Sequence, residues 1–373
     1  MKKRQLILGL VVLAALVALV IWGRSRIPFN FSVFRAQLAQ ADWIKIALSA
    51  GCIYLAYVFR SVRWAALLKH NKKVGPFTLL GTQVIGFTAV ALIGRVADPV
   101  RPYLVAKKTG LPLSSQIAVY IVERLFDAGS MALIFSVAML SVPYEDIVRV
   151  TSRSHLISLL GSHSPFLAAF AARYGGLVLT LLGALFLLIV RLAGNTVASL
   201  AENSLGLLSK KLGTAVAEKI RAFHAGLDTM RTFAEFGVTA GLSISMWLLI
   251  AAAYYVGVLA FSASPELAAV TPSKCVLLMI ASGGASVFQL PVLGWFTQIG
   301  IVAAALTGLF GANAEAATAC ATVLLLTTFL GIVPIGLIWA QFEHVSLRQV
   351  TVESEHVSDK LAEPDTAPPV SLG

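Results

Sequence analysis

The stretch GVTAGLSISMWLLIAAAYYVGVLAF, residues 237–261, runs for 25 residues without a charged side chain. A helix of about 20 apolar residues crosses the roughly 30 Å hydrocarbon core of a membrane. Only a helix suits a single apolar stretch there, because lipid offers no partner to free backbone N–H and C=O groups. The stretch therefore predicts a membrane span, and with it an all-α integral membrane protein.

The composition of the whole chain agrees with this prediction. Its 373 residues are 58% hydrophobic and only 13% charged, with a mean hydropathy of +0.84. A soluble domain is about half apolar and a quarter charged, so this chain has too little polar surface to face water on all sides. About six transmembrane helices are predicted, over Leu6–Trp22, Trp43–Phe59, Gln116–Ala138, Gly175–Val190, Gly237–Phe261 and Ala316–Ala340.

The first of these stretches has a second interpretation. Three basic residues at positions 2–4 precede it, as in a secretory signal peptide. However, it ends in Trp22-Gly23-Arg24, which offers no small-x-small cleavage site. We therefore interpret it as an uncleaved first span within an N-terminal segment over residues 1–42.

Two further apolar stretches, Phe77–Gly94 and Cys275–Gly311, differ from the spans, and the second is too long for one crossing. Glycine and proline interrupt them, at Gly81, Gly86, Gly94, Gly283, Gly284, Pro291 and Gly294. Such residues are typical of broken or re-entrant helices, which occur where protein or a watery cavity covers the backbone. We predict that both stretches form re-entrant or broken hairpins.

The distribution of Lys and Arg predicts the orientation. With a cytoplasmic N-terminus and two re-entrant hairpins, 20 of these residues face the cytoplasm and seven face outside, as the positive-inside rule requires. If Phe77–Gly94 spanned the membrane instead, the basic stretch 191–231 would move outside. The pI of about 9.7 then indicates attraction to anionic lipid headgroups, and nucleic acid is not an expected partner.

The predicted elements form an inverted repeat within a transmembrane domain over residues 43–340. Residues 43–140 and 237–340 each contain a span, a loop, a broken hairpin and a second span, and they begin on opposite sides of the membrane. Paired broken segments in inverted halves indicate a binding site between the halves. The polar residues 341–373 are expected to form a disordered tail.

Between the halves, apolar residues recur at three- to four-residue steps over residues 194–235, with lysines and arginines among them. This spacing predicts an amphipathic helix on the cytoplasmic interface. A connector packed on the helical bundle fits the same pattern.

Charged residues inside a predicted span are candidates for function. Glu123 and Asp127 lie one helical turn apart, and Arg124 reaches Asp127 at a spacing of three residues. Burial of a charge at this depth costs at least about 2.5–3.5 kcal/mol. These residues therefore form either a structural group of ion pairs or a site that lines or gates the path of a substrate.

A second group of charges flanks the first hairpin. The planar fork of arginine binds phosphate through two hydrogen bonds, which predicts a lipid-headgroup site. Retention of positive charge in the cytoplasm is the simpler explanation for Arg60 and Arg63, which follow the second predicted span. It does not explain why Asp98 and two prolines stand among the arginines of the hairpin. The predicted headgroup site comprises Arg60, Arg63, Arg95, Asp98 and Arg101.

Signatures of catalysis are missing from the sequence. It carries no Walker A loop, no His-Glu-x-x-His and no Gly-x-Ser-x-Gly motif. Cys52, Cys275 and Cys320 lie far apart within apolar segments, a spacing that fits neither a disulfide framework nor a metal site. We therefore expect no enzyme activity, no cofactor and no bound metal.

Four stretches of the sequence carry a family resemblance: Arg60–Leu68, Gly94–Tyr103, Val122–Asp127 and Pro291–Gln298. Together they resemble the lysylphosphatidylglycerol synthase transmembrane-region family, also called flippase-like domain proteins, over about residues 40–340. The resemblance implies membrane helices with re-entrant segments, and movement of phospholipids or polyprenyl-linked glycolipids between leaflets.

The chain departs from the family's pattern at five positions. Ile93 and Ala97 stand where the first hairpin usually has Pro and Gly, and Val292 and Leu293 replace two glycines of the second. Gln298 stands in the place of a Glu, so a role for an ionised acid there does not carry over. The soluble aminoacyl-transferase domain of the bifunctional members is not expected, since only a short polar stretch follows the last span.

The resulting hypothesis is a lipid transporter, or flippase, of a bacterial or archaeal cytoplasmic (inner) membrane. It moves an anionic lipid whose headgroup binds at the predicted arginine site. The alternative is a non-transporting membrane partner that presents a lipid-linked substrate to an enzyme; a lipid-modifying enzyme is disfavoured because no nucleophile–base pair is present. A second copy of the chain and an enzyme of lipid metabolism are the protein partners considered. The residues expected to line or gate the path are Glu123, Arg124, Asp127 and Gln298.

Overall fold

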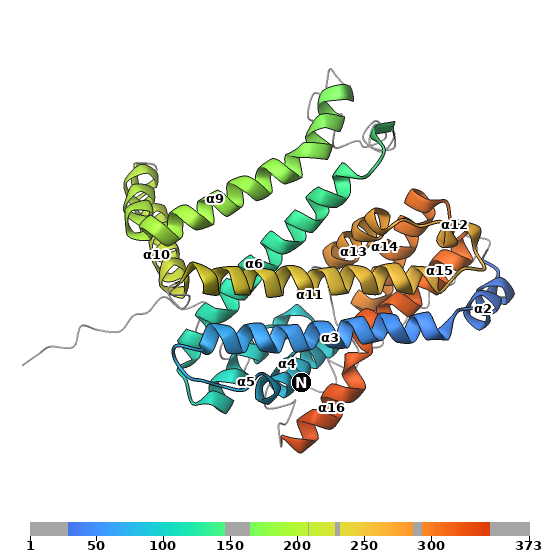
Figure 1. Cartoon of the computed structure of the whole chain (residues 1–373), viewed down its shortest axis with the longest axis horizontal. Helices are drawn as coiled ribbons and strands as arrows, with labels where there is room; N and C mark the ends of the chain where they lie inside the picture. The colour runs from blue at the N-terminus through green and yellow to red at the C-terminus, as the bar shows by residue number, and fades with distance from the viewer. Residues whose placement is uncertain (1–28, 146–164, 208, 228–231, 286–292, 344–373) are drawn as a thin grey trace, which may run out of the picture.

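The computed structural model describes residues 29–145, 165–207, 209–227, 232–285 and 293–343. The predicted first span lies outside these residues, as does nearly all of the predicted tail. Every regular element among the described residues is a helix, which confirms the all-α fold (Figure 1). In chain order the elements are α2 (Phe31–Ala39), α3 (Trp43–Leu68), α4 (Pro76–Ile93), η1 (Arg95–Ala97), α5 (Val100–Thr109), α6 (Leu113–Leu140), α9 (Pro165–Gly206), α10 (Lys210–Leu227), α11 (Phe233–Leu259), α12 (Pro265–Ala268), α13 (Pro272–Ala285), α14 (Leu293–Phe310), α15 (Ala314–Leu325), η3 (Leu326–Leu330) and α16 (Ile332–Phe342).

Four of these helices are long and apolar enough to cross a membrane: Trp43–Leu68, Pro76–Ile93, Phe233–Leu259 and the composite Ala314–Phe342. Two of the four contain a predicted span, and Phe233–Leu259 contains all but the last two residues of another. The other, α4, qualifies by length and composition, although the chain turns back after it. The predicted spans Gln116–Ala138 and Gly175–Val190 lie within α6 and α9.

Two long helices, α3 and α11, lie side by side at the centre and run antiparallel (Figure 1). At one end the N–H of Asp42 donates to the carbonyl of Ala260 over 2.8 Å. At the other end Nε2 of His70 lies 2.9 Å from Oε1 of Glu235. Because these helices open the two predicted halves, their antiparallel packing agrees with an inverted repeat.

Each half contains a helical hairpin. In the first, α4 packs on α5, and Nζ of Lys72 donates to the carbonyl of Thr109 over 2.6 Å, so the two ends of the hairpin meet. In the second, α13 packs on α14, and Nζ of Lys274 lies 5.9 Å from the ring centroid of Phe310. The chain therefore enters and leaves each hairpin at the same end.

The same short connection follows both hairpins. The first is followed by Gly110 with φ 69° and the second by Gly311 with φ 77°, and in each case two more residues precede the next helix. This left-handed backbone conformation favours glycine, because a side chain would strain it. The matching connections support a common plan for the two halves.

The glycines of the first hairpin have two different roles. Gly94 (φ 95°) follows the last residue of α4, where the helix ends, whereas the helix is continuous through Gly81 and Gly86. A Cβ at Gly86 would collide with the side chain of Arg101. Gly81 and Gly86 therefore allow neighbouring side chains to pack closely against α4, and they do not interrupt the helix. In the second hairpin, Gly283, Gly284 and Gly294 likewise lie inside helices, and Pro291 lies outside the described residues.

The predicted amphipathic helix over residues 194–235 is not one helix. α9 ends at Gly206, and α10 begins at Lys210 and packs back against α9 (Figure 1). A Cβ at Gly213 would lie 2.7 Å from the carbonyl oxygen of Glu202, so glycine permits this close reversal. Thr232 then caps α11 by accepting the N–H of Glu235 over 3.2 Å. The apolar spacing runs on across the reversal and therefore does not reveal it.

The last apolar helix is irregular halfway along its length. Leu326–Leu330 form a π-helical turn, in which the N–H of Gly331 donates to the carbonyl of Leu326 over 2.6 Å. Pro334 lies four residues after Leu330 and has no N–H to donate to its carbonyl, so a regular α-helix is interrupted there. Turns of this kind occur often at functional sites.

Candidate functional site

Five charged side chains form a buried ion cluster between α3, α5 and α6. Each is at most 7% exposed. The i, i+3 and i, i+4 spacings place the two charges of α3 on one face and the two of α6 on one face, and the two faces meet. The cluster consists of Arg60, Arg63, Arg101, Glu123 and Asp127.

Arg63 is the centre of this cluster. Its Nη2 lies 2.7 Å from Oε1 of Glu123, and its Nη1 lies 2.7 Å from both Oδ1 of Asp127 and Oγ of Ser243. Trp247 donates from Nε1 to Oδ1 of Asp127 over 3.3 Å. Ser243 and Trp247 belong to α11, so the cluster also ties the second half of the molecule to the first.

Arg101 is enclosed on the other side of Glu123. Its Nη1 lies 3.3 Å from both carboxylate oxygens of Glu123 and 3.3 Å from Oε1 of Gln83. The guanidinium carbon lies 4.4 Å from the ring centroid of Phe87, and the missing side chain of Gly86 leaves room for its stem. Arg101 is 0% exposed and does not line the cavity described below, so in this structure it offers no exposed surface to a headgroup. Its charge instead offsets that of Glu123.

A second set of charges lies closer to open space. Nη2 of Arg124 is 3.6 Å from Oδ1 of Asp98, and Nη1 of Arg124 is 3.8 Å from Oδ2 of Asp127, the pairing predicted from the i+3 spacing. Nη1 of Arg95 is 3.7 Å from Oδ2 of Asp98. The buried Nε and Nη2 atoms of Arg124 have no hydrogen-bond partner, although Nη2 is within ion-pair range of Asp98. The guanidinium of Arg124 is therefore held by two ion pairs longer than 3.5 Å and by the ring of Tyr120, whose centroid lies 4.9 Å from the guanidinium carbon.

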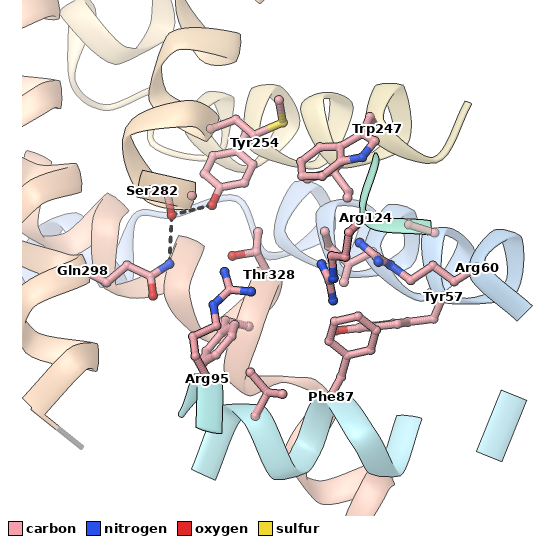
Figure 2. Close-up of a pocket in the computed structure, with 17 residues that line it drawn as sticks. Tyr57, Arg60, Phe87, Arg95, Arg124, Trp247, Tyr254, Ser282, Gln298 and Thr328 are labelled. Carbon is pink, nitrogen blue, oxygen red and sulfur yellow. Dashed lines mark hydrogen bonds between the residues drawn. The ribbon is translucent and has the colours of Figure 1, made fainter. Parts of the chain in front are cut away.

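These arginines border a cavity of about 180 Å³ that lies between the two halves. Its lining comes from both central helices, both hairpins, α6 and the π-helical turn (Figure 2). Three arginines face it, and none of the described residues that line it is Asp or Glu. We call it the central cavity; its polar and aromatic lining comprises Tyr57, Arg60, Phe87, Arg95, Arg124, Trp247, Tyr254, Ser282, Gln298, Thr328 and Phe329.

Uncharged polar groups of the second half lie across the cavity from Arg60 and Arg124 (Figure 2). Nε2 of Gln298 donates to Oγ of Ser282 over 2.8 Å, and the hydroxyl of Tyr254 donates to the same Oγ over 2.7 Å. Oε1 of Gln298 has no hydrogen-bond partner, and the residue is 5% exposed. This wall therefore holds a buried acceptor without a partner in a residue that lines the cavity.

The structure separates the nine predicted site residues into two groups. Arg60, Arg95, Arg124 and Gln298 line the central cavity, with Asp98 beside them, whereas Arg63, Arg101, Glu123 and Asp127 lie behind the wall. Sequence reasoning missed the remaining polar and aromatic lining residues. Each lies in an apolar helix, where a lone hydroxyl or ring carries no signal of its own. One residue, Pro334, could have predicted the π-helical turn that precedes it.

Most of this sequence matches a known protein family. A family model described as "Lysylphosphatidylglycerol synthase TM region" matches residues 6–336. The chain belongs to this family. Membership confirms the resemblance seen in the sequence motifs and a multi-pass membrane domain related to lipid handling. No curated protein and no solved structure matched the chain.

Proposed function

We propose that this member of the lysylphosphatidylglycerol synthase transmembrane-region family moves an anionic lipid between leaflets, either a phospholipid or a polyprenyl-linked glycolipid. The observation that carries the proposal is the central cavity, which is formed by both inverted halves and faced by three arginines without a lining carboxylate among the described residues. Paired discontinuous segments around one site are the usual architecture of membrane transporters. In this proposal the protein acts as a transporter and not as an enzyme.

The proposed path follows from the two groups of charges. The headgroup enters the cavity and exchanges its hydration for contacts with Arg60, Arg95 and Arg124, while the acyl or prenyl tails stay in lipid. The buried ion cluster keeps its internal pairs and fixes α3 against α6. Movement of the hairpins relative to α3 and α11 would then open the cavity to one leaflet or the other. One direct contact, from Nε1 of Trp295 in α14 to the carbonyl of Ala91 in α4 over 3.1 Å, joins the hairpins in the state described here.

The orientation is part of the proposal. The ends of the first hairpin, the end of α3 and the α9–α10 reversal lie together at one end of the molecule (Figure 1). Lysines are concentrated there, at Lys69, Lys72, Lys73, Lys107, Lys108 and Lys210. The positive-inside rule places such an end in the cytoplasm, in agreement with a cytoplasmic N-terminus in a bacterial or archaeal inner membrane.

The test is transport by the purified protein. Liposomes containing a fluorescent anionic phospholipid are reconstituted with the protein, and a membrane-impermeant quencher reports how much label is accessible from outside. Parent protein should raise the accessible fraction above that of empty liposomes. Arg124→Lys should slow the movement at least several-fold, because lysine keeps the charge and loses the bidentate fork. Arg35→Lys, at an exposed position on α2, is the matched control and should behave like the parent.

Two results would contradict the proposal. Transport that is absent from purified protein and restored by a co-purified enzyme would favour the alternative, a membrane partner that presents a lipid-linked substrate. Transport that is unchanged in Arg124→Lys and in Arg95→Lys would remove the arginines of the cavity from the mechanism.

A further inference from the structure

The central cavity has two chemically different ends. One end carries the guanidinium groups of Arg60 and Arg124, and the other carries Ser282, Gln298 and Tyr254, with Arg95 near the latter (Figure 2). A single ligand that fills the cavity must therefore satisfy two sets of partners. This requirement excludes more headgroups than the positive charge of the cavity would exclude by itself.

The arginine end requires an anion with at least two acceptor atoms. Nε and Nη2 of Arg124 have no hydrogen-bond partner, although Nη2 lies 3.6 Å from Oδ1 of Asp98. Together they form the edge of a guanidinium that binds phosphate or carboxylate through two parallel bonds. The nearby carboxylates are already paired: Asp127 with Arg63 at 2.7 Å, and Asp98 with Arg95 and Arg124 at 3.7 and 3.6 Å. They lie outside the lining of the cavity, so the field inside it is positive.

The opposite end requires a hydrogen-bond donor. The amide nitrogen of Gln298 is used by Ser282, whose Oγ also accepts the hydroxyl of Tyr254. The remaining group, Oε1 of Gln298, is an acceptor in a residue that is 95% buried, and it lacks a partner. A buried acceptor left without a donor loses the hydrogen bonds that water would have given it. A hydroxyl of the ligand would supply that donor.

An ammonium group also donates hydrogen bonds, but the electrostatics of the cavity oppose it. Three arginines face the space, and among its described lining residues no carboxylate is present to pair with a cation. A buried cation without a counter-ion is strongly disfavoured. Hydroxyl groups supply the donor without adding positive charge.

We propose that the central cavity selects a lipid whose phosphodiester carries an uncharged polyol, such as glycerol or a sugar, and rejects headgroups that carry an ammonium. The phosphate binds at Arg124 and Arg60, and a hydroxyl of the polyol donates to Oε1 of Gln298. The choice of a lipid rather than a soluble phosphorylated polyol rests on the proposed function. The selectivity rests on the lining residues alone.

Three short-chain lipids test the phosphate contact and the hydroxyl contact separately. The three share the diacylglycerol phosphodiester and differ in the headgroup alcohol: that of dioctanoyl phosphatidylethanol has no polar group, that of dioctanoyl phosphatidylglycerol has hydroxyls, and that of dioctanoyl phosphatidylethanolamine has an ammonium. Their affinities for the purified full-length protein in detergent are measured by titration calorimetry. Phosphatidylglycerol should bind roughly three- to tenfold more tightly than phosphatidylethanol, as one added neutral hydrogen bond predicts. Phosphatidylethanolamine should bind more weakly than either.

Variants assign each preference to its residue. Gln298→Leu should abolish the advantage of phosphatidylglycerol over phosphatidylethanol, and its thermal unfolding midpoint, measured beside that of the parent, checks that the variant is folded. Gln298→Glu places a carboxylate in the cavity and should shift the preference toward phosphatidylethanolamine. Arg124→Gln should weaken phosphatidylglycerol and phosphatidylethanol alike, by roughly tenfold or more for a lost charge-assisted pair. Gln341→Leu, at an exposed position on α16, is the control and should match the parent.

Equal affinity for phosphatidylglycerol and phosphatidylethanolamine in the parent would overturn the proposal. So would an equal loss for all three lipids in Gln298→Leu. Free glycerol 3-phosphate should bind far more weakly than phosphatidylglycerol, and comparable binding would reassign the site to a soluble ligand. Failure of the proposed function is a separate result: it would appear as the predicted selectivity in binding without lipid movement in liposomes.

Discussion

At the scale of single residues, Arg63 and Arg60 show how one helix can serve two purposes. They are three residues apart on α3, yet Arg63 is 1% exposed and makes two contacts of 2.7 Å with carboxylates, whereas Arg60 borders the central cavity at 3.4 Å from both acids. Short, enclosed ion pairs fix geometry, and longer pairs beside open space leave a cation available to a ligand. The same division separates Arg101, enclosed beside Glu123, from Arg124.

The first prediction concerns Arg63. Arg63→Ala leaves Glu123 and Asp127 without their shortest partner inside the protein, and breaking a buried pair in this way costs about 3–5 kcal/mol. We expect a marked fall in the thermal unfolding midpoint in detergent and in the yield of folded protein. Arg124 is a weaker partner of Asp127, at 3.8 Å, so Arg124→Ala should lower stability less.

The control for this comparison is Arg35→Ala, at an exposed position on α2, which should change stability by no more than about 0.5 kcal/mol. Equal stability of Arg63→Ala and the control, by differential scanning fluorimetry, would show that the buried ion cluster is not structural.

At the scale of elements, the helices are joined at positions where a side chain is missing. Gly86 makes room for Arg101 within the first hairpin, and Gly336 of α16 makes room for Thr88 of α4. In isolation a glycine lowers helix stability by about 0.8–1.0 kcal/mol relative to alanine. Here the cost is offset by close packing, which brings α4 against α5 and α16 and closes one side of the central cavity.

The second prediction follows from that packing. Gly86→Ala should destabilise the protein, because the added Cβ would collide with the stem of a fully buried arginine. Gly129→Ala is the matched control: Gly129 lies inside α6, is exposed, and has nothing within 4 Å of the added atom. It should be neutral or slightly stabilising through helix propensity. The measurement is the thermal unfolding midpoint of both variants and the parent in the same detergent. A similar rise of the midpoint in both variants would mean that Gly86 is not a packing glycine.

The third prediction concerns the cap of α3. Oδ1 of Asp42 accepts the N–H groups of Ile44 and Lys45 at 3.0 and 3.2 Å, and Oδ2 lies 3.2 Å from Nζ of Lys45. The backbone hydrogen bond from Lys45, with the nearby ammonium, lowers the pKa of Asp42 below its ordinary value of 3.8. A lowered carboxyl pKa stabilises the fold above that value, and the contribution is lost as the pH falls through the folded-state pKa.

In Asp42→Asn the cap acceptor remains and the charge is gone. The decline in the thermal midpoint between about pH 6 and about pH 3 should therefore be smaller in the variant than in the parent. An identical pH dependence would mean that Asp42 contributes only as a cap and not through its charge.

At the scale of the whole molecule, two halves of the same plan meet around one cavity. Their first helices pack antiparallel, each half continues into a hairpin whose ends meet, and each hairpin ends in a left-handed glycine. An inverted arrangement, as the sequence predicts, would present equivalent segments to opposite sides of the membrane. An architecture of this kind suits a site that must be reached from both leaflets.

The last prediction is the topology. In a background without Cys52, Cys275 and Cys320, single cysteines at positions 73, 107 and 210 should all react with an impermeant maleimide from the cytoplasmic side, and one at position 262 should react from outside. All four positions are exposed. Labelling of positions 73 and 107 from opposite sides would mean that α4 crosses the membrane completely and would remove the re-entrant hairpin.

The class of the protein, the positions of most apolar helices and the charged candidates could be predicted from the sequence. Entry into lipid depends on the composition of each segment alone, and a charge in such a segment stands out because its burial is costly. The packing role of Gly86, the reversal within residues 194–235 and the choice of arginines that face the cavity could not be predicted. They depend on contacts between different helices, such as Arg63 with Ser243, 180 residues away, and periodicity within one segment carries no information about its neighbours.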